Sequence, residues 1–190
     1  MKKAYKGVVL AGLATAAVVL ASQAQAQNTS TNPPQTVTQV DIAKYQGDWY
    51  EIARLPMYFQ RNCASDSKAN YRLNADNTVT VRNQCITKKG KLQVAEGLAT
   101  SQNPPQNSKL KVTFLPKGLR WLPFGKGDYW ILKLDENYQT VLIGGESREY
   151  LWVLSRTPNL DEQTYQDYVN TAKQQGYDVS KLIRTPHTQK

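Results

Sequence analysis

The sequence predicts an all-β protein: an eight-stranded antiparallel up-and-down β-barrel with a short N-terminal helical turn and one C-terminal α-helix packed on the barrel. Eight runs of alternating apolar and polar residues follow one another with mostly short links, a pattern typical of such barrels. A single helical pattern comes after the last of these runs. The part of the chain that carries them has the length of one domain.

The first 26 residues have the features of a signal peptide. Three lysines precede an apolar run from Val8 to Leu20, and Ala24-Gln25-Ala26 has the small-residue pattern of a cleavage site. An uncleaved N-terminal anchor is the alternative interpretation of the same run. We therefore divide the chain into a cleaved signal peptide at 1–26, a flexible leader at 27–38, one domain at 39–186 and a tail at 187–190.

The charge of the mature chain argues against a nucleic-acid partner. Removal of the three signal lysines takes 24 basic residues to 21, against 15 acidic ones, for a net charge of +6. These charges are spread along the chain rather than gathered in a block, as expected for a solvated surface. An attraction to anionic lipid head groups stays open.

The strands are expected in the following order. Asp41 caps a short helical turn that Gly47 ends, and the first strand follows. The clearest hairpin has its turn at Ala75-Asp76-Asn77. The expected strands are 49–54, 68–74, 78–85, 93–99, 110–115, 128–135, 140–144 and 150–156.

Two segments interrupt the strand pattern. The loop at 116–127 contains two prolines, three glycines and four large apolar side chains, which is unusually apolar for a loop. After Pro158, Asn159 and Glu162 form an expected capping box for a helix that continues to about Gln175, with Gly176 ending it. One side of this helix is apolar enough to dock on the barrel.

The only two cysteines, Cys63 and Cys85, are expected to form a disulfide in an exported protein. A catalytic thiol would need a basic partner, and a metal site would need more ligands. The only histidine, His187, lies in the tail, where we expect disorder, so an axial haem ligand is not expected within the fold. The sequence therefore predicts no enzyme, no metal and no cofactor, with Glu51 as a structural carboxylate near Trp49.

A barrel of eight strands can fill its interior with side chains or hold one small ligand. Alternation within the strands selects an inner wall that is aliphatic and aromatic, which suits an apolar ligand with a polar end. The alternative is that the aromatic side chains fill the core. Capture of an anionic ligand is less favoured, because Arg72, Lys109 and Lys111 fall on the outer face by this count. The inner wall is expected to include Leu110, Val112, Phe114, Trp130, Leu132, Leu134, Tyr150, Trp152 and Leu154, with Tyr71 and Asn83 as polar points.

Three stretches resemble the motifs of the lipocalin family. The stretch 47–54 (GDWYEIAR) resembles the first motif, Asp135 with Tyr138 lies where the second occurs, and 151–158 (LWVLSRTP) resembles the third. The resemblance runs from about Val40 to Pro186. Within the family, the chain looks most similar to the bacterial outer-membrane lipocalins, the plant temperature-induced lipocalins and apolipoprotein D.

The resemblance implies a division of the barrel into a structural floor and an open mouth. Gly47, Trp49 and Arg156 would form the floor, with Arg156 stacked on Trp49. The cavity would open at the other end, at the same rim as the two cysteines. The expected ligand-binding residues are Tyr71, Asn83, Val112, Phe114, Trp130, Leu132 and Trp152, and the expected mouth residues are Tyr58, Phe59, Trp121, Leu122 and Phe124.

The function implied by the resemblance is non-enzymatic binding, storage or transport of fatty acids or lysophospholipids in the cell envelope. Some lipocalins are isomerases or epoxide-converting enzymes, which is the alternative. The loop at 116–127 would give reversible membrane contact, cap the mouth or bind another protein. Bacterial members are often outer-membrane lipoproteins, but no cysteine lies near the cleavage point. We expect a protein without a lipid anchor, in the periplasm, peripheral to the outer membrane, or secreted. The oligomeric state stays open between monomer and dimer.

Overall fold

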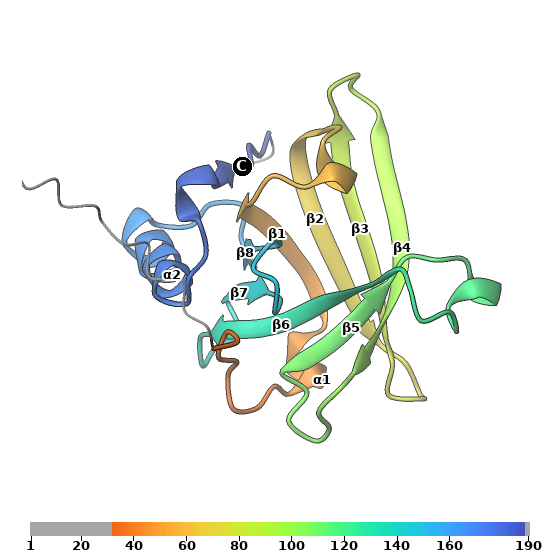
Figure 1. Ribbon diagram of the computed structural model, residues 1–190. Coiled ribbons are helices and arrows are strands. Elements are labelled where there is room, and N and C mark those ends of the chain that lie inside the picture. The colour runs from red at the N-terminus through yellow and green to blue at the C-terminus, as the bar shows by residue number, and fades with distance from the viewer. Residues whose placement is uncertain (1–31, 189–190) are drawn as a thin grey trace, which may run out of the picture.

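The computed structural model describes residues 32–188. The predicted signal peptide and the first residues of the predicted leader lie outside the described residues. The sheet runs in the order β2-β3-β4-β5-β6-β7-β8-β1-β9, and β1 also pairs with β2, so that the first eight strands close into a barrel. All pairings are antiparallel. The predicted fold class is confirmed (Figure 1).

All eight predicted strands are present, with shifted ends. The strands are β1 (Gly47–Arg54), β2 (Cys63–Leu73), β3 (Val79–Thr87), β4 (Leu92–Ser101), β5 (Lys109–Thr113), β6 (Lys126–Leu134), β7 (Thr140–Gly144), β8 (Trp152–Ser155) and the additional β9 (Ile183–Arg184). The helices are α1 (Ile42–Tyr45) and α2 (Glu162–Gln174), with 3-10 turns η1 (Tyr58–Gln60), η2 (Lys117–Leu119) and η3 (Val179–Lys181).

One end of the barrel is closed by α1 (Figure 1). The Asp41 carboxylate accepts a hydrogen bond of 2.9 Å from Ala43 N, which caps this turn. Beneath it, Trp49 is 0% exposed and its Nε1 donates to Tyr45 O at 2.9 Å. The Arg156 guanidinium lies 4.0 Å from the Trp49 ring centroid and donates to Lys44 O and Asp48 O, both at 2.9 Å. This stack joins β1, the turn α1 and Arg156, the residue that follows β8.

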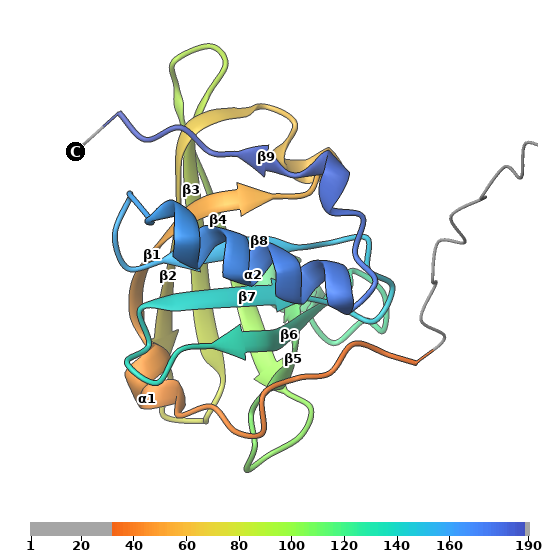
Figure 2. The same cartoon turned by 90° about the vertical axis from the view of Figure 1, so that its left-hand side faces the viewer.

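Helix α2 packs across the outer face of the barrel over β7 and β8 (Figure 2). It starts two residues later than expected. Asp161 is the N-cap and accepts from Thr164 N at 2.9 Å, so the predicted pairing of Asn159 with Glu162 is wrong. Glu162 is the first helical residue, two positions before the third helical position from which a capping-box glutamate reaches back to the cap. The helix ends as expected before Gly176, whose φ is +87°.

Apolar residues form two layers, one inside the barrel and one between the sheet and α2. The inner layer includes Trp49, Val81, Leu110, Ile131 and Leu154. The outer layer is built from side chains of the sheet and of the helix: Ile52, Leu142, Val153, Tyr165 and Tyr168. Strands β6, β7 and β8 are consequently apolar on both faces.

The C-terminal segment fills a gap in the barrel wall. Strand β1 pairs with β2 only as far as Tyr50 opposite Lys68, and β9 then takes the place of β2 beside Ala53 and Arg54. His187 Nε2 lies 2.8 Å from Glu51 O. The sequence predicted neither β9 nor this contact, and the expectation that His187 is disordered is wrong.

Candidate functional site

The end of the barrel opposite α1 gathers four loops, which join β1 to β2, β3 to β4, β5 to β6, and β7 to β8 (Figure 1). Cys63 and Cys85 form a disulfide at this end, with a Cα–Cα distance of 5.6 Å. The predicted bond is therefore confirmed. It ties the start of β2 to β3, and so fixes the end of the loop that leads from β1.

The closed half of the barrel is filled by side chains. A cavity of about 10 Å³ remains there, lined by residues that include Tyr45, Tyr71 and Tyr129. The Tyr129 hydroxyl lies 2.7 Å from the Tyr45 hydroxyl and donates to the Tyr71 hydroxyl at 2.8 Å. Burial raises the pKa of all three phenols, because their ionised form would be cut off from water. Tyr71, an expected ligand contact, thus belongs to a hydrogen-bonded floor.

The open half has an inner wall that solvent reaches. Asn83 pairs with Ala95, so these two residues lie on the inner face together with Val81 and Gly97. Ala95 is exposed although it faces inward. A Cβ added to Gly97 would lie 2.9 Å from the Phe114 ring, so that this ring covers Gly97. Phe114 is nevertheless 43% exposed.

The inner wall of the open half is accessible to solvent at Ala95 and Phe114. Three expected ligand contacts face this space: Asn83, Phe114 and, opposite Ala99, the half-buried Val112. Asn83 Oδ1 is buried and accepts no hydrogen bond among the described residues.

Trp152 lies at the rim of the open half, on the inner face of β8 by alternation with Leu154. Its Nε1 donates to Gln60 Oε1 at 3.0 Å. Its ring packs with Tyr150 and Phe59 at centroid distances of 6.2 and 6.4 Å. The loop between β1 and β2 therefore contributes an aromatic edge to the mouth.

Two expected ligand contacts lie elsewhere. Trp130 and Leu132 belong to the outer apolar layer beneath α2, and their neighbours Tyr129 and Ile131 face inward. The predicted orientation is therefore wrong for Trp130 and Leu132, whereas Leu134, which follows a bulge in β6, packs against the inner layer as expected. The physical reason is that β6 is buried on both faces, so that alternation of apolar and polar residues does not reveal which face is the inner one.

The sequence also missed a buried ion pair on the inner wall. A bulge in β1 between Glu51 and Ala53 places both Ile52 and Ala53 in the outer layer. As a result, Glu51 and Arg54 both face inward. Arg54 Nε lies 3.2 Å from Glu51 Oε1, and both side chains are less than 10% exposed. The only signal in the sequence was the pair of adjacent apolar residues between the two charges.

The loop from β5 to β6, residues 114–125, extends away from the barrel (Figure 1). Trp121 is 75% exposed and Phe124 is 64% exposed, whereas Leu122 is half-buried. Hydrogen bonds within the loop hold its shape, such as Trp121 Nε1 to Gly118 O at 2.9 Å. The expected mouth residues Tyr58 and Phe59 are also exposed.

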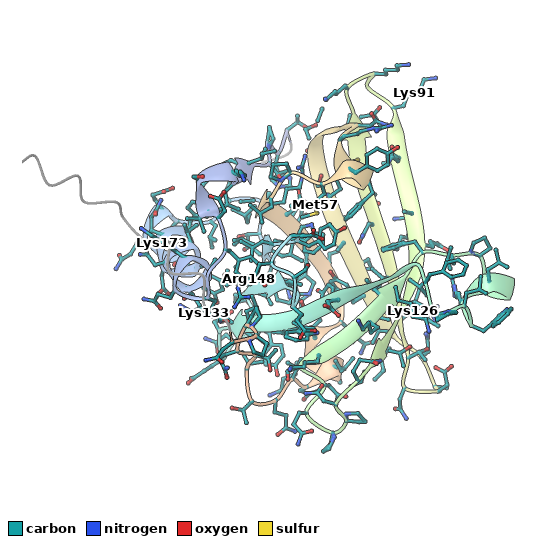
Figure 3. The ribbon with its side chains drawn as sticks, viewed as in Figure 1. Met57, Lys91, Lys126, Lys133, Arg148 and Lys173 are labelled. Carbon is teal, nitrogen blue, oxygen red and sulfur yellow. A yellow bond between two sulfur atoms is a disulfide. The ribbon has the colours of Figure 1, made fainter. Side chains whose placement is uncertain are left out.

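Basic side chains flank this end of the protein. Figure 3 shows Lys91 at the hairpin between β3 and β4 and Lys126 where the 114–125 loop returns, both on the side away from α2 and Lys173. Within residues 32–188, no helix is long and apolar enough to cross a membrane. The same part of the chain holds no group of three side chains suited to bind a metal ion.

Comparisons with known proteins agree with this architecture. The family model described as a lipocalin-like domain matches residues 40–187. The chain is 43% identical over 156 residues to temperature-induced lipocalin-1 of Arabidopsis thaliana, covering 81% of this chain and 83% of the relative. It is 37% identical over 158 residues to the outer membrane lipoprotein Blc of Escherichia coli K12, covering 81% and 85%.

Solved structures show the same fold at lower identity. Insecticyanin from the tobacco hornworm Manduca sexta superposes with a TM-score of 0.62 at 20% identity, over 83% of this chain and 86% of insecticyanin.

Proposed function

The chain belongs to the lipocalin family, whose members bind small hydrophobic ligands, and we propose that it binds, stores or transports fatty acids or lysophospholipids in the cell envelope. The observation that carries this proposal is the solvent-reached inner wall of the open half. There the small side chain of Ala95 leaves room, and Trp152 and Phe114, whose ring covers Gly97, supply apolar surface. The ligand would lie in this half, above the tyrosine floor.

The proposed contacts are a subset of those that the sequence suggested. Asn83, Val112, Phe114 and Trp152 are retained as ligand contacts, with Phe59 at the rim. Tyr71 acts as part of the floor. Trp130 and Leu132 are not proposed, since they face α2.

A binding role is favoured over an enzymatic one by the state of the cysteines. Both are held in the disulfide, so the described residues offer no free thiol as a nucleophile. The buried tyrosine hydroxyls bond one another, and their raised pKa values oppose ionisation.

We propose an exported protein of the periplasm or the extracellular space. The signal-peptide pattern of residues 1–26 supports export. Similarity to a relative named as an outer membrane lipoprotein also supports the cell envelope.

Filling the open half tests the binding function. Ala95→Trp adds a large ring to the inner wall, and Glu96→Trp adds the same ring on the exposed outer face of the same strand. In titrations of delipidated protein with a fatty acid and a lysophospholipid, Ala95→Trp should weaken binding at least about 10-fold, which corresponds to about 1.4 kcal/mol. Glu96→Trp should bind as the wild type does. Equal affinities for the two variants would overturn this location, and no uptake by the wild type would overturn the function.

We also propose reversible membrane contact by the 114–125 loop. Trp121, Phe124 and Leu119 are exposed together, and Lys117 and Arg120 lie between them, a combination suited to an anionic interface. Trp121→Ser should lower binding to vesicles that contain anionic lipid. Leu92→Ser, at a 59% exposed site on β4, serves as the control and should leave vesicle binding unchanged.

A further inference from the structure

The guanidinium of Arg54 is a feature of the barrel interior that the proposed function leaves unexplained. Arg54 is 8% exposed and is paired across the sheet with Trp152, on the inner wall. Its position results from the bulge that brings it to the same side as Glu51. A buried cation is costly unless an anion and hydrogen bonds compensate for the lost water.

Glu51 supplies the compensating negative charge, but it leaves most of the N–H donors of Arg54 without a hydrogen bond. The two Glu51 carboxylate oxygens accept from Gln60 Nε2 at 2.7 Å and from Thr185 Oγ1 at 2.6 Å. Arg54 Nε is buried and makes no hydrogen bond to any of the described residues, because its alignment with Glu51 is poor. The one hydrogen bond of the guanidinium is a long one, from Nη1 to Leu55 O at 3.4 Å, and Nη2 has no partner within residues 32–188.

A guanidinium carries five N–H donors in a planar fork. Most of the Arg54 fork therefore makes no hydrogen bond within residues 32–188. Such a fork matches the paired oxygens of a carboxylate or a phosphate and binds them bidentately.

The position of Arg54 suits the polar end of a ligand. It is the last residue of β1 at the open end, next to the loop that carries Phe59 and Gln60. Gln60 joins Glu51 to the indole of Trp152, so the charged pair and the aromatic rim form one continuous wall. Leu154 continues the same face toward the closed end, as apolar surface for a chain.

We propose that Arg54 is a subsite for the anionic head group of the ligand, a carboxylate or a phosphate, with Glu51 orienting the guanidinium. This inference rests on the proposed function. It narrows the ligand class to amphiphiles with one anionic head group and an acyl chain. Because Glu51 carries the same charge as that head group, it also limits the affinity.

Three probes with the same chain length test the subsite: dodecanoate, lauroyl lysophosphatidate and the neutral dodecanol. They are titrated into delipidated protein at neutral pH. Arg54→Gln should weaken binding of the anionic probes about 10- to 100-fold, the range expected for hydrogen bonds to a charged group. Dodecanol affinity should stay within about twofold, which also shows that the variant is folded.

Two further variants keep the test decisive. Arg72→Gln removes the same charge from an exposed site on the outer face of β2 and should leave all three affinities unchanged. Glu51→Gln removes the competing carboxylate and should raise the affinity for the anionic probes while dodecanol binding stays constant. If Arg54→Gln does not fold, Glu51→Gln carries the test alone.

The outcomes separate the subsite from the proposed function. Weakening of dodecanoate alone or of lysophosphatidate alone supports the subsite and identifies the head group. Unchanged binding of both anions to Arg54→Gln overturns the subsite while the binding function stands. If Arg54→Gln does not fold, unchanged binding of both anions to Glu51→Gln has the same meaning. A wild-type protein that binds none of the three probes overturns the proposed function itself.

Discussion

The closed and open halves of the barrel are built by the same strands, but they differ in what fills them. Along the inner face of β4, Ala99 is 3% exposed near the closed end, and Ala95, four residues earlier in the chain and nearer the mouth, is exposed. In the closed half, three tyrosines fill the space and bond one another. In the open half, Ala95 leaves space on the inner wall, and Arg54 keeps unused donors. The space that solvent reaches in this barrel thus lies beside a small residue of the inner wall, above a closed half that side chains fill.

Trp49→Ala should cause the largest loss of stability. The side chain is fully buried, so its removal should cost about 3–5 kcal/mol, the range for large aromatic side chains in cores. Ligand affinity should change by no more than about threefold, because Trp49 lies in the closed half. Chemical denaturation beside a ligand titration measures both quantities. Trp121→Ala, at a 75% exposed site, is the control and should change stability by less than about 0.5 kcal/mol. A large loss of affinity in Trp49→Ala with the fold intact would break the separation of the halves.

Alkaline pH should destabilise the closed half next most strongly. Burial raises the pKa of Tyr45, Tyr71 and Tyr129 above the value near 10 of the unfolded chain. The unfolded chain therefore loses these protons first, so the stabilising contribution is complete below pH 10 and declines as the pH rises above it. At pH 11, one unit above that value, the loss should reach about 1.4 kcal/mol for each tyrosine, or about 4 kcal/mol for the three.

Urea unfolding at pH 8 and pH 11 measures this loss together with a contribution from Tyr168 and Tyr177, because burial raises the pKa of these two phenols as well. Tyr129→Phe removes one of the three phenols, so its stability should depend less steeply on pH between these values. An equal pH dependence in this variant and the wild type would contradict the assignment of the effect to the tyrosine floor.

Loss of the disulfide should affect the open half. Cys63 and Cys85 are 22 residues apart, and opening a loop of that size should lower stability by about 3 kcal/mol. Because the bond fixes the segment that carries Phe59 and Gln60, the double variant Cys63→Ser/Cys85→Ser should also bind ligand more weakly, unlike Trp49→Ala. A double variant with wild-type affinity would show that this rim is not part of the binding wall.

The fold could be predicted because several independent signals agree along the chain. Eight alternating runs, the turn at Ala75-Asp76-Asn77 and the two cysteines each specify part of the barrel, and their outcomes match the structure. Asp41 caps its turn as expected. These are local features, for which spacing within a few residues is sufficient information.

The binding wall was less predictable because it depends on which face of each strand points inward. The β1 bulge turns Arg54 inward, and the outer apolar layer under α2 hides the orientation of Trp130 and Leu132. The position of His187 beside Glu51 depends on where β1 and β2 separate. Each of these features is decided by tertiary packing, so no pattern within a single run could reveal it.

The four tryptophans provide the most direct test of the division into two halves. Trp49 lies in the closed half, Trp152 at the inner rim, Trp130 beneath α2 and Trp121 on the 114–125 loop. Their indole N–H signals can be followed by NMR while dodecanoate is added to the delipidated protein. The Trp152 signal should shift most, and those of Trp49 and Trp130 should stay in place. Large shifts of Trp49 or Trp130 with Trp152 unmoved would contradict a ligand site in the open half.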